Sequence, residues 1–280
     1  MHVMLTVLVL ALCWGLRRSV VSTGWVRRWP IALLLFLWPP CLLLTTALST
    51  LWMCPDHFTL VHWDDGAMHL LSLLFLGSLT MVCLRLAAEG YAFIRQIARY
   101  PLIDVAGRSV RVIDTPEPFV AQVGFWRPQL VVSSGLMVTL PQDHLKAVLC
   151  HEEAHYYYRD TFWFFWLGCL RRATDWLPNT KLLWEELLAL RELRADQWTA
   201  QRVDPLLLAE SLVLVVQPNA VNLGVCSASI ADGPHRLTER IDALLRPTQP
   251  LVPLAVWFWL GLLLGMFPLL AVPLHLGCLD

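Results

Sequence analysis

Residues 140–160 have the sequence LPQDHLKAVLCHEEAHYYYRD, and this stretch is the one around which the fold is expected to form. Thr139 and Gln142 have the spacing of a helix capping box, and a proline stands in the first turn that follows. We therefore predict a helix from this point through Tyr158. The motif HEEAH lies in the second half of that helix.

The HEEAH motif places three chemically active side chains within one helical turn. His151 and His155 are four residues apart, so both imidazoles project from one face and can bind a single metal ion. Glu152 lies beside them, where its carboxylate can act as a general base toward a water molecule. Zinc is the expected metal, one ion per chain, because imidazole and carboxylate ligands suit it.

A catalytic zinc site needs a third protein ligand and an open position. Glu192 is the best candidate, since Asp196 follows it one turn later on the same predicted helix face. That spacing suggests a ligand glutamate and an aspartate that accepts the N–H of a ligand histidine. Glu185 and Glu186 are the rival ligands, and neither is followed by a carboxylate at this spacing.

The sequence around the motif predicts a small sheet beside helices. Residues 109–134 contain VRVID, FVAQVGF and QLVVSS, which alternate β-branched residues between turn signals and read as strands. Leucines at helical spacing predict a second helix over 181–202, and a short amphipathic helix is predicted over 237–245. Residues 217–234 look like a loop. The region that contains these strands and helices is therefore predicted to have an α+β fold.

The composition is too apolar for one soluble core. Hydrophobic residues make up 57% of the chain and charged residues 15%, whereas soluble domains average roughly 45–50% and about 25%. A lipid bilayer is the expected partner for the excess apolar surface. The net charge of −1 gives no reason to expect direct binding of nucleic acid. The eight cysteines form no CxxC pair, so neither a zinc knuckle nor a disulfide framework is indicated.

Apolar stretches predict an α-helical integral membrane protein with about four transmembrane helices, at residues 2–16, 31–51, 67–88 and 251–276. The link between the first two stretches carries four arginines and no acid, whereas the link between the second and third carries three aspartates and no base. More arginines follow the third stretch. Basic loops favour the cytoplasmic side, so both termini are expected outside a plasma or inner membrane.

This topology predicts three parts of the chain. Residues 1–88 hold three transmembrane helices, 89–250 form a cytoplasmic zinc peptidase domain, and 251–280 hold the last transmembrane helix. One further apolar run, residues 161–170, is too short to span a bilayer. Its aromatic residues suit either a helix that dips into the inner leaflet or a buried core helix.

Several further motifs accompany HEEAH. The first is a turn with sequence GFWRP (Gly124 to Pro128), and the second is Asp160, an aspartate five residues after the second histidine. The others are WLPN (Trp176 to Asn179) and RELRAD (Arg191 to Asp196). Over about residues 110–245 these motifs resemble the antirepressor peptidases of the BlaR/MecR type, which are β-lactam sensor-transducers. Heat-shock and CAAX-type membrane proteases share the zinc motif, but the GFWRP turn fits the antirepressor type better.

The resemblance implies a gluzincin fold and specific roles for residues. The zinc ligands would be His151, His155 and Glu192, the catalytic base Glu152, and the supporting carboxylate Asp196. A segment with sequence PHRLTER resembles a His-plus-Arg segment near the zinc of the CAAX-type relatives. On that basis, oxyanion-stabilising candidates are His235 and Arg240. Signalling members of the family carry an extracellular sensor domain after the last span. Because this chain ends at Asp280, direct sensing of a β-lactam is not expected.

Three functions are compatible with these observations. The first is an endopeptidase that cleaves a cytoplasmic or membrane-proximal protein, with a helix-turn-helix transcriptional repressor among the candidate substrates. The second is a quality-control protease for membrane proteins, and the third is a zinc-binding membrane signalling protein that cleaves nothing. The intact Glu152 argues against the third, since metal binding alone needs no base. We expect an extended substrate to pair with the strand at 129–133. The sequence leaves the oligomeric state open.

Overall fold

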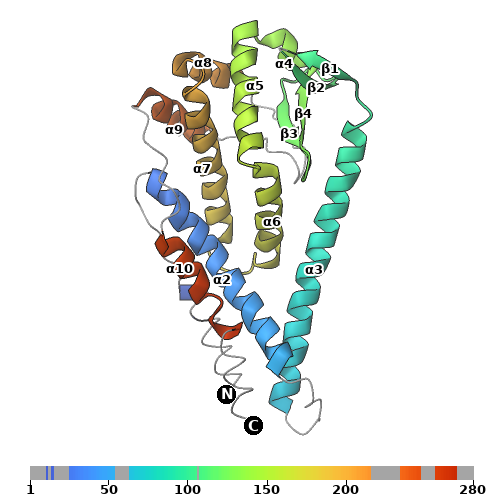
Figure 1. Cartoon of the computed structure of the whole chain (residues 1–280), viewed down its shortest axis with the longest axis vertical. Helices are drawn as coiled ribbons and strands as arrows, with labels where there is room; N and C mark the ends of the chain where they lie inside the picture. Colours follow the sequence, from blue (N-terminus) through green and yellow to red (C-terminus); the bar gives the residue numbers. More distant parts are fainter. Residues whose placement is uncertain are drawn as a thin grey trace. The chain divides into compact units, whose positions relative to one another are not determined.

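The computed structural model describes residues 11, 14–15, 25–53, 63–105, 107–215, 234–246 and 256–269. The chain divides into two compact units, of which the first comprises Met1–Leu84, Cys169–Leu187 and Pro250–Asp280, and the second Arg85–Gly168 and Leu188–Gln249 (Figure 1). Residues 169–187, which lie inside the predicted 89–250 region, thus group with the apolar helices.

Helices dominate both units. In chain order the helices are α2 (Trp25–Met53), α3 (Trp63–Ile97), α4 (Ser134–Thr139), α5 (Gln142–Tyr157), α6 (Asp160–Ala173), α7 (Thr180–Ala200), α8 (Pro205–Val215), α9 (Pro234–Leu245) and α10 (Val256–Leu264). The strands are β1 (Leu102–Val105), β2 (Arg108–Ile113), β3 (Val120–Val123) and β4 (Gln129–Ser133). The predicted strands and the helices at 181–202 and 237–245 are confirmed by β2, β3, β4, α7 and α9.

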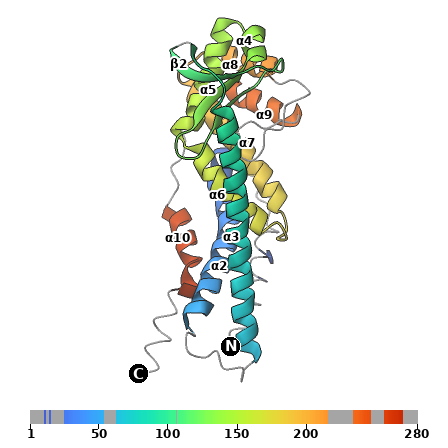
Figure 2. The same ribbon diagram turned by 90° about the vertical axis from the view of Figure 1, so that its right-hand side faces the viewer.

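In the first unit, α2 and α10 lie side by side (Figure 1 and Figure 2). The last carbonyls of a helix have no partner within it, and α2 supplies donors for two such groups. Trp38 Nε1 donates to the backbone oxygen of Gly261 (2.9 Å), and Thr45 Oγ1 donates to that of Gly265 (2.8 Å). The end of α10 is therefore held by polar side chains of α2 rather than by water.

Among the residues that the structure describes, two helices are long and apolar enough to cross a membrane. They run over Arg28–Trp52 in α2 and Gly66–Ile97 in α3. These correspond to the predicted spans at 31–51 and 67–88. The predicted span at 2–16 lies almost wholly outside the described residues, and so do parts of the one at 251–276. Membrane association is therefore supported for the part of the chain that the structure describes.

The second unit contains a four-stranded sheet with the order β1-β2-β4-β3. β2 and β4 run parallel, whereas β1 pairs with β2 and β3 pairs with β4 in antiparallel fashion. The expectation that a substrate pairs with residues 129–133 is wrong, because β4 has a strand hydrogen-bonded on each side. The edge strands are β1, which the sequence pattern did not reveal, and β3.

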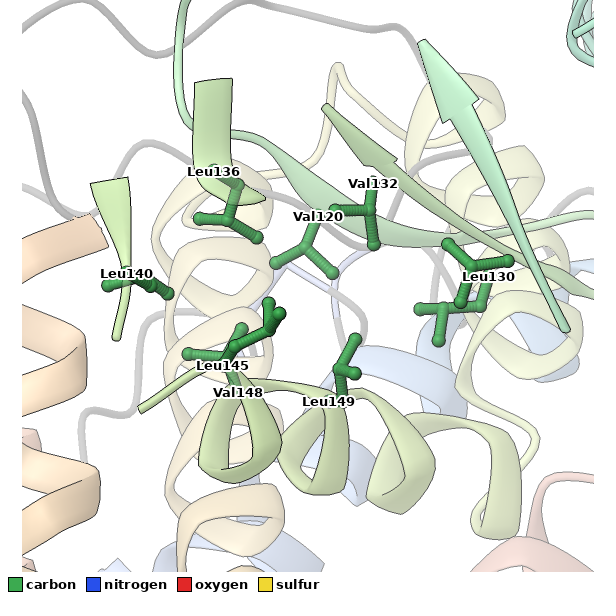
Figure 3. Packing of buried hydrophobic residues seen from close by; sticks show 9 residues of the cluster. Val120, Leu130, Val132, Leu136, Leu140, Leu145, Val148 and Leu149 are labelled. Carbon is green, nitrogen blue, oxygen red and sulfur yellow. The ribbon is translucent and has the colours of Figure 1, made fainter. Parts of the chain in front are cut away.

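Each face of the sheet buries a separate apolar cluster. On one face, valines and leucines of β2, β3 and β4 pack against Leu145, Val148 and Leu149 of α5 (Figure 3). On the other face, Ala121 and Val123 pack with Ile97, at the C-terminal end of α3. Alternate residues of a strand point to opposite faces, so β3 is fixed between α5 and the end of α3.

The start of α5 differs from the predicted capping box. Pro141 is the N-cap residue and supplies no side-chain hydrogen bond. Thr139 instead ends α4, and its hydroxyl donates to the backbone oxygen of Gly135 (2.8 Å). Gly135 itself is required by close packing, because a Cβ there would lie 2.0 Å from the backbone oxygen of Pro116. The predicted end of the helix is confirmed, with Tyr158 as the C-cap.

Helix α6 covers residues 161–170 and has one buried and one exposed face. Phe164 and Phe165 are buried in protein, whereas Trp163 and Trp166 on the other face are exposed. The helix is therefore neither wholly a core helix nor wholly open to its surroundings. Residues 160–168 of the helix belong to the second unit and residues 169–173 to the first.

Candidate metal centre

Small residues bring α5 and α7 close together. Ala154 and Ala195 are fully buried and pack with Cys150 and Trp198. A methyl side chain on each helix allows the backbones to approach, so longer side chains one turn away can meet across the interface. The interface therefore sets the distance between the HEEAH motif and Glu192.

The three predicted ligands converge in a buried cluster. His151 Nε2 lies 3.3 Å from Glu192 Oε2, and His155 Nε2 lies 3.6 Å from Glu192 Oε1. All three ligand atoms lie within 4.8 Å of one another. A tetrahedral site with metal–ligand distances of about 2.1 Å would separate its ligand atoms by roughly 3.4 Å. The cluster can hold a metal ion with little rearrangement.

A carboxylate supports each histidine from behind. Asp196 Oδ1 lies 2.9 Å from His151 Nδ1, and Asp160 Oδ2 lies 2.8 Å from His155 Nδ1. These contacts orient both rings so that Nε2 faces the cluster, as in the carboxylate–histidine pairs that support bound zinc. Asp196 thus has the predicted position. Asp160 fills the same role for the second histidine.

The charges around the cluster leave room for a cation. The carboxylates are those of Glu152, Asp160, Glu192 and Asp196, and the guanidinium groups are those of Arg191, Arg194 and Arg240. With neutral imidazoles, the three arginines balance Asp160, Glu192 and Asp196, and the buried Glu152 next to His151 adds one negative charge. A divalent ion is electrostatically favoured there, because buried charge is stable only when it is paired.

The nearby carboxylates also raise the pKa of both histidines. Burial favours the neutral imidazole of His155, but the Glu192 carboxylate and the hydrogen bond with Asp160 outweigh it and raise its pKa to about 10. Burial likewise opposes charge on His151, yet Asp196 and Glu192 raise its pKa. Burial opposes ionisation of Glu192, but Arg191 and His155 hold its pKa well below the ordinary value. The raised pKa means that both imidazoles bind a proton more tightly than a free imidazole does.

We predict that metal binding strengthens as pH rises through neutrality. Because the pKa of both histidines is raised in the metal-free protein, a metal ion must displace their protons. The expected change is about tenfold in affinity per pH unit for each proton displaced. Calorimetric titration in buffers of different ionisation enthalpy measures the protons released. An affinity that does not change between pH 6 and pH 8 would contradict this prediction.

Glu152 is anchored to the buried edge strand β3. The backbone N–H of Gln122 in β3 donates to Glu152 Oε2 (3.1 Å), and the Gln122 side-chain amide donates to the Glu152 backbone oxygen (3.3 Å). Because β3 is an edge strand, its outward N–H groups have no strand partner. The carboxylate therefore lies where an extended chain would pair with β3.

The remaining predicted residues have different outcomes. Arg240 reaches the site from α9, and its Nε and Nη2 donate to the two carboxylate oxygens of Asp196 (2.7 and 2.9 Å). Its role in oxyanion stabilisation stays a prediction. The side chain of His235 lies outside the described residues. The rival ligands do not join the cluster: Glu186 pairs with Arg28 (3.1 Å), and Glu185 lies 3.9 Å from Lys181.

Four supporting residues were not assigned to the site from the sequence. Arg191 donates twice to Glu192 Oε1 (3.0 and 2.7 Å), and Arg194 pairs with Asp160. Gln122 holds Glu152. Asp160 had one signal, its spacing of five residues after His155, and Arg191 is next to its partner in the sequence. Arg194 and Gln122 have partners that only the folded chain brings together.

A scan against models of known protein families finds no match, and a search of curated proteins finds no significant relative. The inference about function therefore rests on the geometry of the site. That geometry combines a buried three-ligand cluster, a carboxylate behind each histidine, and a glutamate hydrogen-bonded to an edge strand of the sheet.

Proposed function

We propose that the chain is a membrane-embedded zinc endopeptidase that cleaves a cytoplasmic or membrane-proximal protein. The observation that carries this proposal is the buried cluster of His151, His155 and Glu192 with Glu152 adjacent. Two imidazoles and one carboxylate, with a fourth position open, are a known donor set of catalytic zinc. When bound, zinc would polarise the scissile carbonyl and lower the pKa of a water molecule.

The residues of the chain divide the remaining work. Glu152 takes the proton of the attacking water and returns it to the leaving amine. Asp160 and Asp196 keep the two imidazoles oriented and electron-rich. Arg191 and Arg240 keep the buried Glu192 and Asp196 ionised. Each role follows from a contact that is already present without metal.

The substrate would bind as an extended strand along β3. The N–H of Gln122 points away from β4 and donates to Glu152, so β3 has no strand partner on that side, and an added strand would replace this buried contact. A peptide paired there would pass the Glu152 carboxylate. An extended backbone of any sequence can form such hydrogen bonds, which suits an endopeptidase acting on protein segments, including those of a helix-turn-helix repressor.

The experiment that tests this proposal compares cleavage by the wild type and by Glu152→Gln in membranes, with metal content measured on the same samples. Candidate substrates include repressors and misfolded membrane proteins, which separate regulated signalling from quality control. Loss of cleavage with metal retained supports the proposal. Equal cleavage by both proteins would assign the activity to another site.

We also propose that the metal centre faces the cytoplasm. The basis is the arginine-rich link between the first two spans and the acidic link between the next two. Reporter fusions after Arg18, Asp65, Arg246 and Asp280 should report inside, outside, inside and outside in turn. Any other order would place the site on the opposite side of the membrane from a cytoplasmic substrate.

A further inference from the structure

A connected set of aromatic rings joins the β3–β4 turn to α6. Its six members, the aromatic cluster, are Phe125, Trp126, Phe162, Trp163, Phe165 and Trp166. Phe125 contacts Phe165 (ring centroids 4.5 Å apart), and Trp126 contacts Phe162 (5.0 Å). The other rings of α6 contact one another at 5.2 to 6.4 Å. In Figure 1 the ends of β3 and β4 that carry this turn point toward α6.

The aromatic cluster has a buried part and an exposed part. Phe165 is buried, whereas Trp126, Trp163 and Trp166 are 79%, 57% and 45% exposed. Since a tryptophan offers about 250 Å² of surface, the three together expose roughly 450 Å². A contiguous apolar patch of that size matches the largest one on a typical monomer, and such patches are often functional.

The charges beside the aromatic cluster have one sign. The exposed charged residues of the turn and of the segment that begins α6 are Arg127 and Arg159, while the one acid there, Asp160, is buried and paired with His155. Tryptophan next to arginine suits the boundary between headgroups and acyl chains, where the ring is partly buried and the guanidinium meets anionic phosphate.

The aromatic cluster is also tied to a helix that is long enough to cross a bilayer. Val123, the last residue of β3 before the turn, packs in one apolar cluster with Ile97 at the end of α3. The candidate membrane-spanning helix runs over Gly66–Ile97, with Arg85, Glu89 and Arg95 in its C-terminal half, and four residues separate its end from β1. The sheet next to Trp126 is thus packed against the C-terminal end of α3 and connected to it by a short link.

We propose that the aromatic cluster inserts into the interface of a phospholipid bilayer that contains anionic lipid. The β3–β4 turn and the exposed face of α6 enter together, as a two-part anchor. Trp126 lies four residues beyond Gln122, which holds Glu152. The anchor therefore keeps the edge strand and the metal centre at the membrane surface. This binding does not depend on whether the site cleaves peptides.

The test uses the full-length protein in liposomes that contain a phospholipid with a photoreactive group in its acyl chain. Mass spectrometry maps the labelled residues. Val138 on α4 and Leu206 on α8 are the matched controls, since they belong to the same unit and are 87% and 58% exposed. We expect Trp126, Trp163 and Trp166 to be labelled at least about tenfold more than either control. Equal labelling of the cluster and the controls overturns the proposal.

A second measurement separates lipid from a protein partner. Hydroxyl-radical oxidation in the same liposomes reports exposure to water. Low oxidation with high lipid labelling of Trp126 supports the bilayer. Low oxidation with low lipid labelling means that a protein, such as a second copy of the chain, covers the aromatic cluster, which overturns the proposal. Arg127→Gln in liposomes with and without anionic lipid tests the charge: labelling of Trp126 should fall about threefold or more only when anionic lipid is present.

Discussion

Replacing His155 with alanine is expected to remove the metal from the purified protein. The imidazole of His155 is buried and offers Nε2 to the cluster while Asp160 holds Nδ1. Loss of a carboxylate that only supports a ligand weakens metal binding by about 10- to 100-fold, so loss of the ligand itself should exceed 100-fold. Elemental analysis after dialysis against a metal buffer measures the effect.

The matched control is His144→Ala. His144 lies on the same helix, but its Nε2 contacts Glu210 (3.3 Å) rather than the cluster. That variant should keep its metal. His151→Ala and Glu192→Ala should lose metal as His155→Ala does, with a thermal melt to show that each variant is folded. Full zinc content in Glu192→Ala would remove that residue from the site and reopen the search for the third ligand.

Local patterns in the sequence are enough to predict the elements that carry the site. The helix with HEEAH, the strands around it and the helix with Glu192 each follow from periodicity and turn residues within a short window. The pairing of Glu192 with Asp196 is predictable because both lie one turn apart on one helix. The three candidate ligands therefore follow from short-range spacing along the chain.

Features that depend on distant parts of the chain were not predicted. The order of strands places β3, not β4, at the sheet edge, and this order arises from how β2 and β4 pair in parallel. Helix α8 was not predicted, although Asp204 accepts from the Leu206 N–H at its start (3.0 Å). Asp204 followed by a proline is a recognisable start signal, but continuous apolar residues hid the helical period.

The roles of the arginines also required the fold. Arg240 was considered for the oxyanion because of its place in a motif, and its guanidinium is paired with Asp196. Two carboxylates as buried as Glu192 and Asp196 need such partners to stay ionised. Sequence alone does not show which arginine faces which carboxylate, since Arg240 and Asp196 are 44 residues apart in the sequence and lie on different helices.

Glu152→Gln is expected to abolish cleavage while the metal stays bound. Glu152 is not part of the ligand cluster, and its Oε2 accepts from the Gln122 N–H. A glutamine has the same shape and can still accept that hydrogen bond through its amide oxygen, so the fold and the ligands should be preserved. It cannot take a proton from the attacking water, and loss of a general base costs about 10²- to 10⁴-fold in rate.

Glu153→Gln is the matched control for this change. Glu153 is the next residue on the helix, is exposed, and pairs with Arg108 outside the cluster. It should cleave at the wild-type rate, and both variants should contain as much zinc as the wild type. If Glu152→Gln loses its metal, the carboxylate belongs to the ligand set and the assignment of a base fails. If every variant binds zinc and the wild type cleaves no candidate in membranes, the hypothesis of a signalling protein without peptidase activity gains support, because metal binding would then be the only function left for the cluster.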